Sequence, residues 1–330
     1  MRKIIGMGET ILDILFQDDK PVAAVHGGSS FNSIISVGRA GLPCTFLGHT
    51  GGDIVGNKML KFMQKNGVST EYMMIRPTQK SALSLAFLDK NGDADYMFYK
   101  DVPQIEGEWK RPYVEKDDVM IFGSYYAICQ GMRPQVEEML CRMEQGNGIV
   151  YYDLNFRRSH LHELDSLFPT IHANFQKSTI VRGSTDDFDI MFGSRDAQEI
   201  YRQHISPYCP LFICTSGGGK ITVCTPRGTY EFLAPKIKSV VSTVGAGDNF
   251  NAGFCCSLLR YGIRREHLSA LDRNGWLPLI EDACAFAGNV CQSTDNYVST
   301  SFGQEFATVM HHASQKFRPT TESPTSTKCG

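Results

Sequence analysis

The sequence predicts an α/β fold with a mostly parallel central sheet and helices on both of its faces. Strand-like and helix-like segments alternate regularly in the middle of the chain, at 119–122, 133–145, 149–152, 163–176 and 179–181. This βαβα order is typical of parallel sheets. A glycine-rich turn at residues 242–250 then leads into apolar residues at helical spacing. Because ligands bind at the carboxyl ends of strands in such sheets, we expect the chemistry at that edge.

The N-terminal part supplies two further strands and two helices. These elements are a strand at 3–8, a helix that follows the loop at 27–32 and ends at Gly41, a strand at 44–48 and a helix at 53–66. Asp53 is predicted first as the N-cap of the last helix, and Gly67 as its stop.

Two alternating runs, 82–89 and 94–99, flank Lys90-Asn91-Gly92-Asp93. Asn-Gly between such runs predicts a β-hairpin. A hairpin outside the βαβ order indicates a small second sheet, which residues 14–26 would join.

The C-terminal part predicts a strand at 211–215, a hairpin at 220–225 and 229–234, and helices at 248–261 and 278–292. We expect one domain at 1–315, with small-sheet strands at about 14–26 and 82–101. We expect a flexible tail at 316–330, because the chain is rich in Thr, Ser and Pro from Pro319 to Gly330.

Composition excludes several classes of protein. The 330 residues carry a formal net charge of −2, which gives no reason to expect nucleic acid or a membrane surface as partner. The eleven cysteines contain no C-x-x-C pair, so neither a disulfide framework nor a zinc site is indicated. The N-terminus does not resemble a signal peptide, and we expect a cytoplasmic protein.

The turn at 245–248 has the features of an anion site. Gly245, Ala246 and Gly247 are small, so their N–H groups can converge at the start of a helix, where partial positive charge gathers. Asp248 would repel a bound anion, so anion binding does not explain why an acid stands at this position. One purpose is to act as the general base for a hydroxyl that attacks a phosphorus held there. The alternative is a helix start whose dipole Asp248 complements.

Two other nucleotide motifs are excluded. The run Ser216-Gly217-Gly218-Gly219-Lys220 follows a predicted strand, but Cys214 and Ile221 stand where a P-loop needs Gly and Ser or Thr. No G-x-G-x-x-G follows the first strand, which argues against a Rossmann dehydrogenase.

Three motifs together resemble the PfkB (ribokinase-like) carbohydrate kinases. They are Thr243-Val244-Gly245-Ala246-Gly247-Asp248 for the signature D-T-x-G-A-G-D, with Ser242 at its first position, Gly27 to Asn32 for G-G-x-x-x-N, and Gly8 to Asp13 for the fructokinase-type opening G-E-x-x-x-D. The resemblance spans nearly the whole chain. It implies a ribokinase-like three-layer αβα fold with a β lid, Asp248 as the base, and the amides of Gly245, Ala246 and Gly247 as the anion hole.

The resemblance also implies which residues surround the sugar. They are Asp13, Gly28, Asn32, Phe98, Lys100 and Arg157. Each has a structural alternative. Asp13 would merely cap a turn, Phe98 and Lys100 would lie on an exposed strand pair, and Arg157 would be a surface residue paired with Asp153.

For the nucleotide, the resemblance implies Asn155, Ser184, Thr215, Gly217, Gly219 and Asn289, with Asp187 organising the metal. Asp187 could equally favour a helix N-terminus, and Asn289 could satisfy backbone. The implied cofactors are ATP and Mg²⁺. Potassium is in doubt, because Ser242 replaces the acid that often helps to hold it in this family.

The predicted function is therefore an ATP-dependent, fructokinase-like sugar kinase, with a homodimer through the lid as a further expectation. A nucleoside kinase or a 2-keto-3-deoxygluconate kinase of the same family is the first alternative. A non-catalytic sugar- or nucleotide-binding regulator is the second.

Overall fold

The main sheet of this protein is mixed and mostly parallel. The structure is a computed structural model and describes residues 1–88, 94–100 and 109–313. Within them the nine-stranded main sheet has the order β13-β12-β11-β10-β9-β8-β1-β4-β5, and its only antiparallel pairings are those of β12 with β11 and β13. Its strands are β1 (Ile4–Met7), β4 (Cys44–Gly51), β5 (Met73–Arg76), β8 (Val119–Gly123), β9 (Ile149–Asp153), β10 (Ile180–Ser184), β11 (Phe212–Thr215), β12 (Lys220–Thr225) and β13 (Gly228–Leu233).

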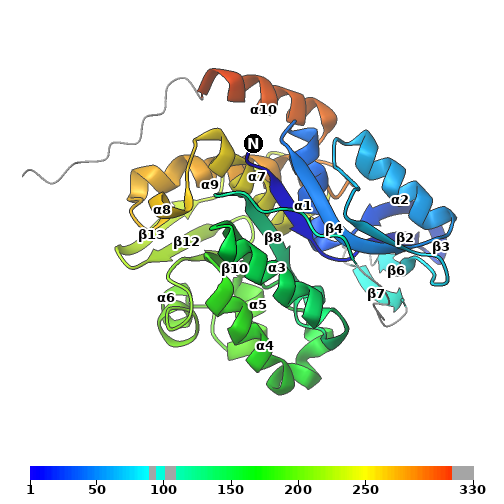
Figure 1. Ribbon diagram of the computed structural model, residues 1–330, viewed down its shortest axis with the longest axis horizontal. Coiled ribbons are helices and arrows are strands. Elements are labelled where there is room, and N and C mark those ends of the chain that lie inside the picture. The colour runs from blue at the N-terminus through cyan, green and yellow to red at the C-terminus, as the bar shows by residue number, and fades with distance from the viewer. Residues whose placement is uncertain (89–93, 101–108, 314–330) are drawn as a thin grey trace, which may run out of the picture.

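Helices cover both faces of this sheet (Figure 1). The alternation along each strand decides the faces: Ile4 packs into one apolar core and its neighbour Ile5 into the other. The first core takes residues from α1 (Ser29–Arg39), α2 (Ile54–Lys65), α7 (Ala246–Arg260), α9 (Arg273–Val290) and α10 (Thr300–Ala313). The second takes residues from α3 (Arg133–Gln145), α4 (Leu164–Lys177), α5 (Thr185–Phe192) and α6 (Ala197–Ile200). The predicted three-layer αβα class is confirmed.

A separate four-stranded sheet lies beside the main one, in the order β3-β2-β6-β7. Its strands are β2 (Ile11–Gln17), β3 (Lys20–Gly27), β6 (Ala82–Leu88) and β7 (Ala94–Tyr99). β6 and β7 are antiparallel, as the Asn-Gly hairpin predicts. The turn itself, residue 101 and the predicted tail lie outside the described residues.

Helix boundaries differ from the prediction by one or two residues at several ends and by more at the start of α9. α9 begins at Arg273, five residues before the predicted start at Pro278, because the Asp272 side chain accepts a hydrogen bond from Gly275 N at 2.9 Å and caps the helix. Pro278 therefore lies inside the helix, where its missing N–H removes one backbone bond. None of the helices in the described part of the chain combines the length and apolar character that a membrane crossing needs.

Candidate active site

The start of α7 is a sharply fixed turn. Gly245 precedes the helix with φ of +77°, and a Cβ there would lie 3.0 Å from the Asn296 carbonyl oxygen, so glycine is required for both reasons. Upstream, the amides of Val241 and Ser242 both donate to the Cys291 carbonyl, at 2.8 and 3.3 Å. These two hydrogen bonds fix the loop before α7 to the end of α9.

The amides of this turn differ from the predicted set of three. Ala246 N donates to the Thr243 carbonyl at 3.2 Å, because the turn closes on itself, so the contribution expected from Ala246 is reduced. The amides of Gly245, Gly247 and Asp248 have no acceptor among the described residues. An anion donor set therefore remains, with Asp248 N in place of Ala246 N.

Both carboxylate oxygens of Asp248 are held by α1. Ser29 Oγ donates to Oδ1 at 2.7 Å and Asn32 Nδ2 donates to Oδ2 at 2.9 Å. Burial raises the pKa of Asp248 to about 6, against the opposing effect of these two hydrogen bonds. The result is an oriented acid that ionises close to neutral pH, beside unpaired amides. Sequence reasoning found Asp248 and Asn32 but missed Ser29.

Asn32 has a further free group. It is 5% exposed, and its buried Oδ1 has no hydrogen-bond partner among the described residues. A buried amide oxygen without a partner costs free energy unless something donates to it. A substrate hydroxyl is a suitable donor, so the predicted sugar contact of Asn32 agrees with its surroundings.

The small sheet contributes Asp13, which accepts a hydrogen bond from Ser84 Oγ across β2 and β6. Burial raises the pKa of Asp13 to about 6. A Cβ on Gly27 would lie 2.3 Å from Asp13 Oδ2, and one on Gly28, whose φ is +124°, would lie 2.4 Å from the Glu9 carbonyl. The diglycine thus lets β3 and α1 pass close to Asp13 and Glu9.

Phe98 and Lys100 lie at the end of β7 that returns to the main body. Phe98 is 51% exposed. Lys100 Nζ lies 2.8 Å from Glu9 Oε2 and 5.4 Å from the Phe98 ring centroid. These contacts join the end of β7 to Glu9, which links β1 to β2, the strand that carries Asp13.

After β9 the chain places Asn155 and Arg157 at the same edge of the main sheet. Asn155 adopts a φ of +39°, and Arg157 is exposed but near enough to lower the pKa of Asp248 by its charge. Arg157 does not pair with Asp153, so that structural alternative is wrong. Asp153 instead pairs with Arg182, at 2.9 Å between Oδ1 and Nη1.

The predicted nucleotide loop follows β11. Thr215 Oγ1 accepts a hydrogen bond from Arg182 Nη2 at 2.7 Å. Gly217 has φ of +48°, and a Cβ there or on Gly218 would meet nothing within 4 Å, so the loop has open space beside it. On α9, Asn289 Oδ1 accepts from Ser299 N at 2.8 Å, as the structural alternative expected, and its Nδ2 lies outside that bond.

Comparison with known proteins decides the family. Residues 2–301 match the description "pfkB family carbohydrate kinase". The chain belongs to this family. The pfkB kinase is accordingly a phosphotransferase that uses ATP and acts on a sugar hydroxyl.

Two of its relatives carry different names. The chain is 28% identical to a fructokinase of Rhizobium leguminosarum bv. trifolii over 268 residues, which is 77% of this chain and 79% of the relative. It is 25% identical to an aminoimidazole riboside kinase of Salmonella typhimurium over 268 residues, 79% of this chain and 82% of the relative.

Solved structures show the same fold. A structure of aminoimidazole riboside kinase from Salmonella enterica with aminoimidazole riboside and an ATP analog has a TM-score of 0.79 at 21% identity, and the match covers 94% of this chain and all of that one. A fructokinase double mutant from Vibrio cholerae with fructose, ADP and potassium has a TM-score of 0.78 at 16% identity, over 93% and 98% of the two chains.

The predicted metal residues of this pfkB kinase form a helix cap. Ser184 N and Oγ each donate to Asp187 Oδ2 at 2.7 Å, and Asp187 N donates back to Ser184 Oγ at 3.1 Å. Burial raises the pKa of Asp187. Its Oδ1 takes no part in this cap, so one carboxylate oxygen is left for a water or a cation.

The described residues contain no cluster of three or more His, Cys, Asp or Glu side chains that could enclose a metal. Magnesium commonly keeps several waters and binds through one or two carboxylates together with substrate phosphates. A single acid at Asp187 fits such an ion, whereas it would not fit one that needs an all-protein ligand set.

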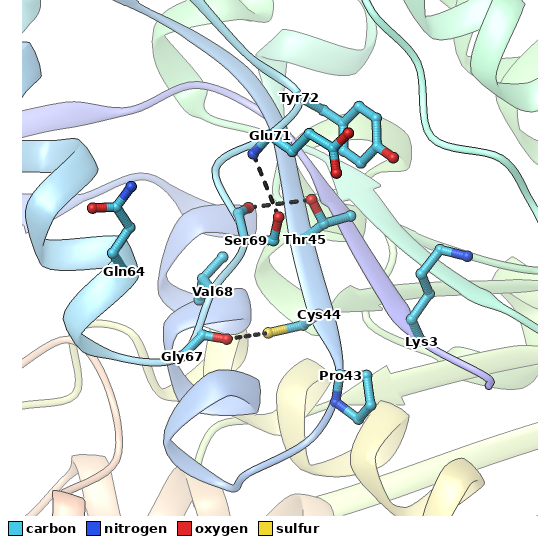
Figure 2. A pocket seen from close by; sticks show the side chains of 10 residues that line it. All are labelled: Lys3, Pro43, Cys44, Thr45, Gln64, Gly67, Val68, Ser69, Glu71 and Tyr72. Atoms are coloured by element: carbon cyan, nitrogen blue, oxygen red, sulfur yellow. Dashed lines mark hydrogen bonds between the residues drawn. The ribbon is translucent and has the colours of Figure 1, made fainter.

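A surface hollow elsewhere is a separate feature (Figure 2). It lies where β1 and β4 begin, opposite to the edge that carries Asp248, and includes Lys3, Cys44 and Thr45. Its polar groups already have partners: Thr45 Oγ1 donates to the Ser69 carbonyl at 3.2 Å within the hollow, and Lys3 Nζ donates to Asp118, outside its lining, at 2.6 Å. Nothing in the hollow requires a ligand.

Two site residues beyond Ser29 were not predicted, Arg182 and Asn251. Arg182 left one signal in the sequence, since a charged residue interrupts the buried run of β10. Asn251 left none, because its Nδ2 reaches Asp153 Oδ2, at 2.8 Å, only across the tertiary fold.

Proposed function

We propose that Asp248 is the general base of a sugar kinase that prefers a ketohexose such as fructose. The observation that carries the proposal is the geometry of this acid: both oxygens are held by Ser29 and Asn32, and unpaired amides lie next to it. A hydroxyl placed between the carboxylate and those amides loses its proton to Asp248 as it attacks the terminal phosphoryl group. The amides stabilise the charge that develops on the phosphoryl oxygens.

The sugar lies between the start of α7 and the small sheet. Asp13 and Asn32 Oδ1 receive hydrogen bonds from its hydroxyls, and Gly28 permits close approach. Phe98, Lys100 and Arg157 complete the pocket, and the small sheet acts as a lid that excludes water and suppresses hydrolysis of ATP. The fructokinase relatives support the ketohexose, and the relative named aminoimidazole riboside kinase makes a riboside the second candidate.

ATP extends from the loop at Thr215, Gly217 and Gly219 to the start of α7, with Asn155 and Ser184 near its phosphates and Asn289 Nδ2 near its base. Asp187 would hold Mg²⁺ through water, and the ion supplies charge neutralisation on the phosphates. Potassium is not required in this proposal, because Ser242 Oγ already accepts a hydrogen bond from Val244 N at 3.2 Å and offers no charge.

Assembly and location belong to the same proposal. Val22, Phe87 and Met97 expose 55%, 39% and 53% of their surface on the small sheet, which favours pairing of two lids in a homodimer. Sedimentation of the full chain tests this, and a monomer at micromolar concentration rejects it. Ten cysteines lie unpaired in the described residues, which suits a reducing cytoplasm.

The test is a panel of ketohexoses, aldohexoses and ribosides with Mg-ATP, each with and without potassium, read as ADP formed. We expect fructose to be the best acceptor, with little effect of potassium. A non-catalytic regulator would instead show thermal stabilisation by sugar or ATP with no ADP formed. Asp248→Asn should bind ATP and lose turnover; full turnover in that variant rejects Asp248 as the base.

A further inference from the structure

Arg182 is a buried cation that the proposed mechanism does not use. It is 6% exposed and is the middle residue of β10. Its Nη1 donates to Asp153 Oδ1 at 2.9 Å and its Nη2 donates to Thr215 Oγ1 at 2.7 Å. Its Nε has no partner among the described residues. One guanidinium therefore joins three neighbouring strands.

The same guanidinium lies against the start of α7. A Cβ built on Gly247 would lie 3.1 Å from Arg182 Nη1 and 3.2 Å from Nη2. Both nitrogens are already committed to acceptors, so the group has little freedom to move aside. A side chain at residue 247 would therefore crowd the Arg182 guanidinium as well as an anion that approaches the amides.

Two more contacts tie this group to α7. The guanidinium carbon of Arg182 lies 5.7 Å from the Phe250 ring centroid. Asp153 Oδ2 accepts a hydrogen bond from Asn251 Nδ2 at 2.8 Å, and Asn251 Oδ1 accepts one from the Tyr151 hydroxyl at 3.0 Å. The ion pair of Arg182 and Asp153 therefore contacts the first turns of α7.

We propose that Arg182 is a positioning residue for phosphoryl transfer. It fixes the open amides at the start of α7 relative to Thr215, the first residue of the nucleotide loop. It also places a permanent positive charge behind Gly247, where the phosphoryl group gains negative charge. The inference rests on the proposed function, since it assumes that these amides receive the phosphoryl group.

Stability alone does not account for this ion pair. Replacing a buried ion pair by apolar groups of similar volume is often neutral or stabilising, because desolvation of two charges is expensive. An ion pair whose side chains are only 7% and 3% exposed is therefore a costly way to hold a sheet together. Fixing the position of a donor set relative to a substrate loop is a role that an apolar pair would perform less accurately.

The chain offers a matched control on the same helix. Arg260, near the C-terminal end of α7, pairs with Asp282 of α9 at 2.9 Å, and the two side chains are 11% and 13% exposed. Its Nε also has no partner among the described residues. Arg182→Gln and Arg260→Gln thus break comparable pairs, one behind the proposed anion hole and one at the far end of the helix.

We expect Arg182→Gln to lower kcat about 100-fold, because a small displacement of reacting groups has this effect. The KM for sugar should stay near the wild-type value and the KM for ATP should rise, since Thr215 loses its donor. Arg260→Gln should lower the melting temperature and keep kcat. Equal losses of kcat in the two variants, or an unchanged kcat in Arg182→Gln, overturn the inference.

Two further variants apply if Arg182→Gln does not fold. Thr215→Val removes one acceptor of the guanidinium and leaves the ion pair, and it should lower kcat while preserving the KM for sugar. Gly247→Ala in the Arg182→Lys background should cost less than the product of the two single losses, because both changes disturb one contact. A Thr215→Val variant that changes only a KM and leaves kcat unchanged contradicts the inference. So do losses in the Gly247→Ala, Arg182→Lys double variant that equal the product of the two single losses. A wild-type chain without sugar-dependent turnover defeats the proposed function instead.

Discussion

Two half-buried carboxylates can be compared: Asp248 lies at the start of α7, and Asp13 lies in β2. Asp248 is held by Ser29 and Asn32 of a neighbouring helix, beside amides with no acceptor. Asp13 is held by a serine of the adjacent strand, in a sheet whose amides pair with one another. Burial raises the pKa of both acids to about 6.

A raised pKa by itself does not assign a role, since burial also raises the pKa of Asp282, beside the far end of α7, to about 6. Only Asp248 has donors nearby that can stabilise charge on a second group, so it can take a proton while a phosphoryl group is stabilised next to it. Asp13 can only accept hydrogen bonds. We therefore expect changes at Asp248 to alter kcat and changes at Asp13 to alter the KM for sugar.

The largest expected effect belongs to Asp248→Asn. The variant keeps the shape of the side chain but removes the base, so kcat should fall about 1,000-fold, within the range for general base catalysis. Steady-state kinetics with the best sugar measures this. The fold should be retained, because the ionised acid costs stability above its pKa. A kcat within a few fold of wild type would show that the two acids have been assigned the wrong way round.

The next effect is that of Asp13→Ala. Loss of hydrogen bonds to a charged group costs about 1.5–3 kcal/mol, so the KM for sugar should rise roughly 10- to 100-fold with a smaller change in kcat. Ser84→Ala is the matched control, since it removes the partner of Asp13 and leaves the carboxylate. An Asp13→Ala variant with wild-type KM would remove the small sheet from the sugar site.

The pH dependence separates the two acids. Because the base must be ionised, kcat/KM should fall about tenfold per pH unit below pH 6 in the wild type. In Asp13→Asn this fall in kcat/KM should persist, because it belongs to Asp248. Initial rates measured between about pH 4.5 and 8, which spans the titration of both acids, will test this. Disappearance of the acid limb would assign it to Asp13.

The contribution of Asp248 to the unfolding free energy should change with pH in the opposite direction to kcat/KM. The folded-state pKa of Asp248, about 6, lies above its ordinary value of 3.8. The native state therefore binds more protons between these values, and stability from this group falls as the pH rises through them. Asp248→Asn should unfold at an equal or higher temperature than wild type at pH 8. A clearly lower melting temperature would contradict this.

The smallest expected effect is at a third acid, Asp53. It caps α2 through Gly56 N at 2.9 Å and also accepts from Ser81 N and Oγ, which together lower its pKa to about 2 against the effect of burial. Asp53→Ala should lower the unfolding free energy by about 1 kcal/mol without changing kcat. Its stabilising effect is present above pH 4 and lost as the pH falls towards 2. Loss of activity in a folded Asp53→Ala would place this acid in the site.

The fold was largely predictable because local patterns repeat along it. Hydrophobic periodicity located the strands and helices of the alternating region, and Asn-Gly located the hairpin. The start of α9 was missed because Pro278 usually marks a first turn, whereas the cap at Asp272 decides the boundary. Strand β5 (Met73–Arg76) and helix α10 (Thr300–Ala313) carry weaker patterns and were not predicted.

The residues that the structure gathers in the candidate site could be named from the sequence where a motif is contiguous. Asp248, Gly245 and Asn32 stand in short signatures that the sequence displays directly. Ser29, Arg182 and Asn251 act through partners that lie 29 to 219 residues away, and no local pattern reports such distances. The use of Ala246 N inside its own turn was also invisible, since it depends on backbone geometry.

The direct junction of β3 and α1 at Gly27-Gly28 has a consequence for how such a kinase can change its substrate. Asp13, the diglycine and the two side chains that orient Asp248 all lie between residues 13 and 32, within one uninterrupted piece of chain. The proposed ATP loop and the helix that carries the proposed base lie some two hundred residues later. Acceptor preference should therefore be transferable between relatives by grafting this short segment, while the phosphate donor half is inherited unchanged.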